Sequence, residues 1–142
     1  MTVSALLKNK DHKIITISQT KTLQDVCNIL TENRIGAIIV CSSTGLVEGI
    51  ISERDVVKAL GQSGATILTQ QVSQHMTANP ISCSSFETIN QIMNKMTTGR
   101  FRHMPVMDGD KLIAVISIGD IVKARMEAME HEAKAMQEYI GS

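Results

Sequence analysis

The feature that most constrains the fold is a repeat, because two segments of similar sequence lie 65 positions apart in this 142-residue chain. The segments are Gly49–Asp55 and Ala114–Asp120, and each is an apolar run that ends in the pattern Ser-x-x-Asp. The similarity extends upstream at an offset of 66, for example from Thr22 to Thr88. A repeat of this length predicts two copies of one structural unit packed against each other.

The composition of the chain indicates which side chains fill the core and which classes of partner are excluded. Hydrophobic residues make up 43% of the chain and aromatic residues only 2%, so aliphatic side chains and nine methionines must fill the core. The 14 basic and 14 acidic residues cancel. The chain therefore lacks the basic surface expected of a nucleic-acid or membrane-surface binder.

The cysteines and the apolar runs indicate a cellular location. The three cysteines show no C-x-x-C spacing, which is typical of a reducing compartment. No apolar run approaches the roughly 18 residues of a membrane span, and the N-terminus has no signal-peptide pattern. We expect a soluble cytoplasmic protein, with an organelle matrix as the alternative if a targeting segment has been removed.

Hydrophobic periodicity predicts the order strand, helix, strand, strand, helix (βαββα) in each unit. In the first unit, apolar or β-branched runs at residues 14–17, 36–40 and 47–51 predict strands. A helix with apolar residues at i, i+3, i+4 and i+7 is predicted to begin after Thr22. Thr22 and its counterpart Thr88 each begin a capping-box pattern, which favours a helix start.

The end of the first unit is predicted from its glycine and polar residues. The helix that begins after Ser52 can end at Gly61, where glycine suits a helix C-cap. Residues 62–71 are rich in Gly, Ser, Thr and Gln and are interpreted as a linker.

The closing helix of the second unit carries a longer apolar pattern than its counterpart. Six apolar residues follow one another at spacings of 4 and 3, as in a heptad repeat. A helix of this length extends about 30 Å, which is further than its own unit can cover. The apolar edge therefore needs a partner, either the N-terminal segment or another subunit. The six residues are Val122, Met126, Met129, Ala133, Met136 and Ile140.

Two βαββα units in tandem resemble the cystathionine-β-synthase (CBS) domain pair, also called the Bateman module. Residues 100–108 and 112–117 look like the central strand and hairpin of that family, and Ser52–Asp55 like its strand-to-helix junction. The resemblance covers almost the whole chain. It implies an α/β (α+β) fold in which two pseudo-symmetric CBS repeats pack through their sheets, with an extended C-terminal helix.

The resemblance also sets expected boundaries and a function. We expect one CBS domain at residues 7–67, a second at 76–132 and a helical extension at 133–142. In the family, two clefts between the units are commonly used by adenosine-containing ligands such as AMP, ATP, NAD(H) or S-adenosylmethionine. The resemblance further implies a homodimer, no catalysis and no required cofactor, so we expect a regulatory module that acts on an unknown effector protein.

The Ser-x-x-Asp junctions are the first candidate ligand-binding residues. A carboxylate at the edge of a cleft can accept hydrogen bonds from both hydroxyls of a ribose, a role we assign to Asp55 and Asp120. Ser52 and Ser117 precede them by one helical turn and can orient the same sugar. Each pair is also explained as a helix N-cap followed by an acidic first turn, and both interpretations stay open.

Residues at the strand starts are candidates for the walls that receive the base. In the family, the first strand lines the cleft, and apolar residues of the central strands suit a purine. The candidates are Thr16, Ile17, Ala37, Ile38, Ile39, Ser82, Cys83, Met104 and Pro105.

Basic residues and one glycine are candidates for phosphate binding, because helix N-termini and cations attract anions. Arg100 also fits a helix C-terminus and His103 also fits a structural role, so both alternatives stay open. Glu53-Arg54 in one copy is Ile118-Gly119 in the other, which predicts unequal clefts, one favouring phosphate and the other the nucleoside. The phosphate candidates are Arg54, Arg100, Arg102, His103 and Gly119.

Patterns typical of enzymes are not found in the sequence. The four histidines are scattered without metal-ligand spacing, and no P-loop or G-x-G-x-x-G motif occurs. We therefore expect no catalysis. The alternative to a ligand-binding regulator is a dimerising scaffold whose clefts stay unoccupied and whose methionine-rich C-terminal helix carries the interaction.

Overall fold

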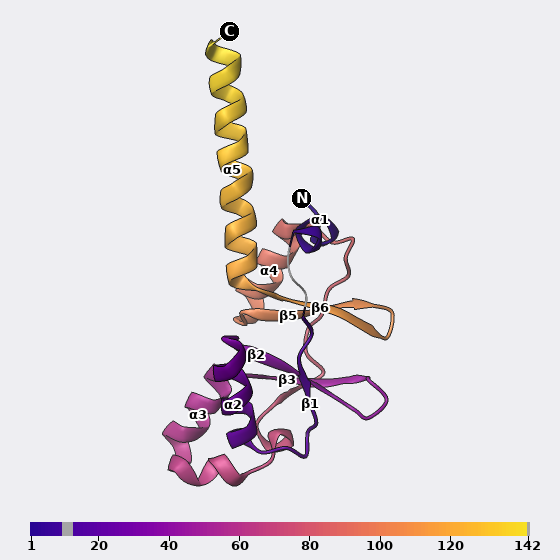
Figure 1. Cartoon of the computed structure of the whole chain (residues 1–142), viewed down its shortest axis with the longest axis vertical. Helices are drawn as coiled ribbons and strands as arrows, with labels where there is room; N and C mark the ends of the chain where they lie inside the picture. The colour runs from indigo at the N-terminus through magenta and orange to yellow at the C-terminus, as the bar shows by residue number, and fades with distance from the viewer. Residues whose placement is uncertain (10–12, 142) are drawn as a thin grey trace.

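The protein, seen here as a computed structural model, consists of two units stacked along the long axis, with one helix projecting from an end (Figure 1). The structure describes residues 1–9 and 13–141. A four-stranded sheet has the order β1-β2-β3-β4, and β5 and β6 form a second sheet. The expected mixed α/β fold with two sheets and a long C-terminal helix is confirmed.

The first unit follows the predicted βαββα order. β1 pairs in parallel with β2, and β2 pairs antiparallel with β3 in a register that aligns Ile39 with Ile50. The hairpin between them turns at Gly45, whose φ of 86° favours glycine. The elements are β1 (Thr16–Ile17), α2 (Leu23–Asn33), β2 (Ala37–Cys41), β3 (Val47–Ser52) and α3 (Glu53–Ser63).

The second unit repeats this order with a much reduced first strand. Its elements are α4 (Ile89–Gly99), β5 (His103–Asp108), β6 (Lys111–Ser117) and α5 (Ile118–Gly141). The offset of 66 places the counterpart of β1 near residues 81–84, where only a parallel bridge between Cys83 and Val106 is present.

Equivalent helices of the two units begin and end in the same way. Thr22 and Thr88 accept hydrogen bonds from the third backbone N–H of α2 and α4 and complete capping boxes. Arg34 and Arg100 end these helices in the left-handed conformation, with φ of 53° and 56°. Both arginines therefore serve as helix C-caps, which is one of the two roles predicted for Arg100.

The segment that leads into each unit packs against the other unit. α1 (Val3–Lys8) buries Val3, Leu6 and Leu7 in the core of the second unit. The short 3-10 helix η2 (Val72–Gln74) instead buries Val72 in the core of the first unit, and β4 (Thr77–Ala78) pairs with β3. This exchange joins the two units, so neither unit completes its core alone.

The region after α3 differs from the prediction. Gly61 lies inside α3, which ends at Ser63 and is capped by Gly64, whose φ of 73° favours glycine. Residues 64–69 form the 3-10 helix η1 (Gly64–Thr69), which buries Ile67 in the core of the first unit. Residues 62–71 connect the two units, as predicted, but they are packed as a short helix on the first unit, where Leu68 also contacts the core.

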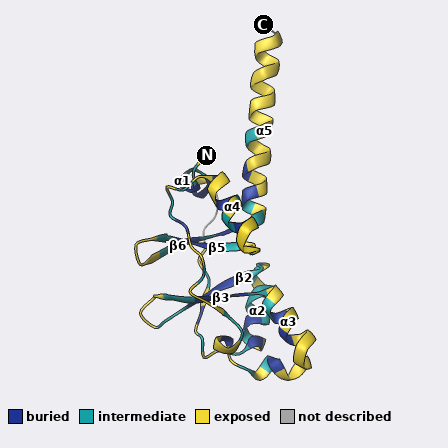
Figure 2. Ribbon diagram, turned by 180° about the vertical axis from the view of Figure 1, so that it is seen from behind, coloured by how far each residue is buried: buried dark blue, intermediate teal, exposed yellow. Residues whose placement is uncertain are grey.

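The two cores account for most of the buried residues of the body, whereas α5 is exposed along most of its length (Figure 2). Ala124 is the last buried residue of α5 in the described part of the chain. The N-terminal helix α1 packs on the second unit and leaves the apolar edge of α5 exposed. None of the helices in residues 1–9 and 13–141 combines the length and apolar character that a bilayer crossing needs.

Gly49 tests the packing of β4 on the four-stranded sheet. A Cβ at this position would lie 2.8 Å from the backbone oxygen of Thr77 and 2.7 Å from Sδ of Met76. We expect Gly49→Ala to lower the free energy of unfolding by about 1–3 kcal/mol, since β4 must shift. Urea denaturation measures this loss.

The control for this variant is Gly61→Ala in α3. A Cβ at Gly61 meets nothing within 4 Å, and alanine favours the helix by about 0.5–1 kcal/mol. Opposite signs for the two variants are expected. A neutral Gly49→Ala would contradict the described contact between β3 and β4.

Candidate functional site

Each Ser-x-x-Asp junction forms a capping box that fixes the aspartate carboxylate. The Ser52 and Ser117 backbone N–H groups donate to Oδ2 of Asp55 and Asp120, at 2.8 Å in both units. In return, Oγ of each serine accepts from the aspartate N–H, at 3.3 and 3.2 Å. The helix-start interpretation therefore holds.

A second equivalent contact joins each junction to the start of the neighbouring central strand. The Glu53 N–H donates to the Gly36 carbonyl at 2.9 Å, and the Ile118 N–H donates to the Arg102 carbonyl at 2.8 Å. The first turns of α3 and α5 are thereby tied to the residues just before β2 and β5. Side chains at these positions can border the same cleft.

A hollow of about 420 Å³ opens beside Asp120 between the two units. The second unit contributes His103, Val115, Ser117 and Asp120. The first unit contributes the end of α2, the start of β2 and the residues before β1, which are Lys13, Ile15, Asn33, Arg34, Ile35, Gly36 and Ala37. The hollow thus combines a fixed carboxylate, cationic side chains and a few apolar side chains.

Small residues explain why this side is open. Gly36 and Ala37 border the Asp120 hollow, whereas their repeat counterparts are Arg102 and His103. A Cβ at Gly36 would lie 3.0 Å from Cε1 of His103, so the imidazole lies directly against the glycine. Any larger residue at position 36 would displace the imidazole and narrow the hollow.

The Asp55 junction carries an arginine where the Asp120 junction has a glycine. Nη1 of Arg54 approaches the carbonyl oxygen of Arg100 at 3.5 Å and so spans from the first unit to the second. The counterpart of Arg54 is Gly119, which has no side chain to span the other side. Among the described residues, Asp55 does not border the hollow that Asp120 lines. The two junctions are therefore unequal, as the sequence predicts.

A second hollow of about 660 Å³ adjoins the first and brings together other predicted phosphate residues. It shares Arg34, Gly36 and His103 with the Asp120 hollow and adds Arg102 and Gly119. Three of the five predicted phosphate residues thus gather beside the Asp120 junction. Arg54 and Arg100 contact each other and line neither of these two hollows.

Most of the predicted base-contacting residues lie elsewhere. Ala37 lines the Asp120 hollow, but Ile38, Ile39 and Met104 are at most 1% exposed, so they face the core. Ile17 and Pro105 are also buried. Thr16 lines a third hollow, of about 720 Å³, between the two hairpin turns.

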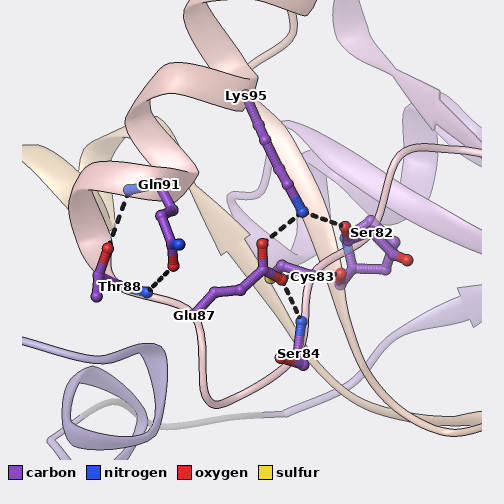
Figure 3. A network of polar contacts seen from close by, with 8 residues as sticks. Ser82, Cys83, Ser84, Glu87, Thr88, Gln91 and Lys95 are labelled. Carbon is purple, nitrogen blue, oxygen red and sulfur yellow. Dashed lines mark hydrogen bonds and ion pairs between the residues drawn. The ribbon is translucent and has the colours of Figure 1, made fainter.

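Ser82 and Cys83 belong to a polar network at the edge of the second unit (Figure 3). Lys95 donates to the Ser82 carbonyl at 3.2 Å and pairs with Glu87, which accepts from the Ser84 N–H at 2.7 Å. The Cys83 thiol points inward and donates to the Pro105 carbonyl. Burial raises the pKa of Cys83 to about 11, so the thiol stays protonated.

Several residues of the hollow were not predicted from the sequence. Lys13 and Asn33 line it, and Arg34 does so in addition to its capping role. Two of them could have been identified from the sequence. Lys13 directly precedes the first predicted strand, and Arg34 is the repeat counterpart of the phosphate candidate Arg100. In residues 1–9 and 13–141, no cluster of three or more His, Cys, Asp or Glu side chains could hold a metal ion.

Comparison with known families identifies the repeat. Two stretches, residues 6–62 and 72–127, match the family model of the CBS domain. The chain belongs to the CBS domain family. The two matches cover most of the chain, so the repeat described above is a pair of CBS domains.

Relatives of this CBS pair occur in bacteria and plants. A CBS-domain containing protein of Agrobacterium tumefaciens is 42% identical, with a TM-score of 0.86 over 88% of this chain and 99% of that one. CBSX3, mitochondrial, of Arabidopsis thaliana is 29% identical, over 98% of this chain and 71% of that protein. The chain spans only 23% of the length of CBSCBSPB2 of the same plant, to which it is 30% identical.

Two structures of similar fold contain adenosine compounds. The CBS domain protein PAE2072 from Pyrobaculum aerophilum, complexed with AMP, is 24% identical over 84% of this chain and 89% of that one, with a TM-score of 0.75. The CBS domain pair of protein MJ0100, in complex with 5′-methylthioadenosine and S-adenosyl-L-methionine, is 21% identical over 90% and 98%, with a TM-score of 0.80. At these identities the likeness shows a shared fold.

The buried Cys83 thiol should make this CBS pair less stable at alkaline pH. In the unfolded chain the thiol loses its proton near its ordinary pKa of 9.0, whereas in the folded protein it keeps it until about pH 11. The unfolded state therefore gains up to about 1.4 kcal/mol per pH unit between these values. Urea denaturation at a series of pH values measures the loss.

The matched variant for this measurement is Cys83→Val, which keeps a small apolar side chain and removes the ionisable group. Above pH 9 it should lose less stability than the wild type, and below pH 9 the two proteins should respond alike. The same alkaline loss in both proteins would contradict the burial of the thiol.

Proposed function

We propose that this CBS pair is a regulatory module that binds an adenosine-containing ligand in the hollow beside Asp120. The observation that carries the proposal is the set of groups that meet there. The Asp120 carboxylate suits two ribose hydroxyls, while Lys13, Arg34 and His103 offer charge or donors for phosphate. Candidate ligands are AMP, ATP, NAD(H) and S-adenosylmethionine.

Two observations on related folds support the class of ligand. PAE2072 was solved with AMP and the MJ0100 pair with S-adenosyl-L-methionine, and an adenosine moiety is common to both. The hollow of about 420 Å³ lies within the usual range of small-molecule sites. We propose binding without catalysis. We further propose a location in the cytoplasm or in an organelle matrix; the relative CBSX3 is mitochondrial.

The hollow is connected to α5 through its own residues. Asp120 receives the Ser117 N–H bond that caps the first turn of α5, and it also faces the hollow. A ligand that binds the Asp120 carboxylate would favour one orientation of this turn over others. We propose that an effector protein, or the second subunit of a homodimer, senses ligand occupancy as a change in α5.

A second candidate function is a dimerising scaffold with unoccupied clefts. The observation that favours it is the exposed apolar edge of α5, where Met126, Met129 and Met136 are each more than half exposed. The two candidates differ in whether ligands change the stability of the protein.

Thermal unfolding with nucleotides separates the candidates and tests the site. At 100 times its Kd, a ligand that binds only the folded state stabilises it by about 2.7 kcal/mol. We expect AMP, ATP, NADH or S-adenosylmethionine to produce such a shift in the wild type. Asp120→Asn should weaken binding about 10-fold or more, because it removes the charge from the ribose hydrogen bonds.

Asp55→Asn is the matched control, because it makes the same change in the equivalent capping box. It should keep the shift produced by the ligand. An equal loss in both variants would show that the Asp120 hollow is not the preferred site. No shift with any of the four compounds in the wild type would contradict ligand binding and favour the scaffold.

A further inference from the structure

The C-terminal part of α5 projects from the body (Figure 1) and carries an exposed apolar stripe. Beyond Ala124, the last buried residue of the helix, Met126, Met129 and Met136 are 57–60% exposed and Ile140 is 77% exposed. No other element of the described chain covers these side chains. We call Val122, Met126, Met129, Ala133, Met136 and Ile140 the α5 stripe.

We infer that α5 pairs with α5 of a second copy of this chain as a parallel two-stranded coiled coil. The inference rests on the homodimer of the proposed function, and it is independent of the ligand. The α5 stripe repeats every seven residues, with Met126, Ala133 and Ile140 in one series and Val122, Met129 and Met136 in the other. These series are the a and d positions through which two helices of the same repeat interlock.

The charges beside the α5 stripe favour parallel pairing. With Met126 at position a, Arg125 is at g and Glu130 is at the following e. In a parallel pair, Arg125 faces Glu130 of the partner subunit, and two such pairs of opposite charge form by symmetry. The next g and e positions hold Glu132 and Gln137, which do not repel each other.

Antiparallel pairing of the same stripe brings like charges together. Aligning Met126 of one helix with Met136 of the other places Glu130 beside Glu130 and Glu132 beside Glu132. Like-charged residues in such contacts destabilise the pair. In that arrangement Arg125 lies near Tyr139, which supplies no carboxylate.

The body of the molecule is also compatible with a parallel pair. Val57 of α3 is 66% exposed and borders the same hollow as Ile118 and Gly119 at the start of α5. A parallel pair places both bodies at the same end of the helices, where Val57 offers further apolar surface. An antiparallel pair places the bodies at opposite ends.

The charge around the α5 stripe fits a second copy better than a membrane. From Met126 to Gly141 the helix carries four glutamates and a single lysine, Lys134. Helices that lie on membranes are rich in basic residues, because the lipid surface is anionic. An acidic helix with a heptad stripe instead meets a matching stripe on an identical chain.

Matched alanines on α5 test the pairing. Ala133 lies in the α5 stripe, whereas Ala135 lies two residues away and off it. Ala133→Glu would face the same glutamate of the partner subunit in a dry interface, so the dimer dissociation constant should rise about 100-fold or more. Ala135→Glu should leave it unchanged. Sedimentation equilibrium measures both, and a monomeric wild type or equal effects in the two variants would overturn the inference.

Single cysteines test the orientation, in a Cys27→Ser, Cys41→Ser background that retains the buried Cys83. In a parallel pair, Met126→Cys and Met136→Cys should each form a disulfide-linked homodimer under mild oxidation. In an antiparallel pair neither should do so alone, and a mixture of the two variants should give the crossed dimer. Glu127→Cys, which lies off the stripe, is the control.

The crossed result would overturn the parallel arrangement, as would the absence of disulfide-linked dimers in both single variants. The thermal shift with AMP is measured on the same proteins. Because the α5 stripe lies outside the Asp120 hollow, loss of pairing leaves that shift in place, so failure of this inference is distinguished from failure of the proposed ligand site.

Discussion

The capping box at each strand-to-helix junction is the constraint on which the proposed site depends. A serine backbone N–H holds one carboxylate oxygen of the aspartate at 2.8 Å in both units, so the carboxylate position is set by the helix start itself. The structural role and the binding role of this motif are therefore compatible. The capping box orients the aspartate in advance, and a ligand that binds the carboxylate need not order that side chain again.

The exchange of lead-in segments makes the space between the units a defined feature. Val3 completes the core of the second unit and Val72 completes that of the first, so the units are held by each other's apolar residues. Lys13, which follows the N-terminal lead-in, thereby reaches the hollow beside Asp120. The helix α5 begins at the Ser117–Asp120 junction, which also borders this hollow. The hollow and the projecting helix are therefore physically connected through the same residues.

The repeat and its periodicity were sufficient to predict the βαββα order, the two helix starts at threonine and the long final helix. The packing of η1 was not predictable, because Ile67 and Leu68 are a short apolar pair within a polar segment and show no periodicity. Nor was the inward orientation of Ile38 and Ile39, since a continuous apolar run does not indicate which side chains face a ligand. The difference between the two clefts was predictable from Arg54 and Gly119. The role of Gly36 in leaving space for the imidazole became clear only from its contact with His103 in the structure.

The central claim is that an adenosine ligand occupies the hollow beside Asp120, and hydrogen exchange measured by mass spectrometry tests it most directly. AMP at saturating concentration should slow exchange of backbone amides in residues 33–37, which line the hollow, and in residues 117–120, whose first and last members line it. Residues 52–55, at the equivalent junction, should change much less. Protection confined to residues 52–55, equal protection at both junctions, or none at either would contradict the account.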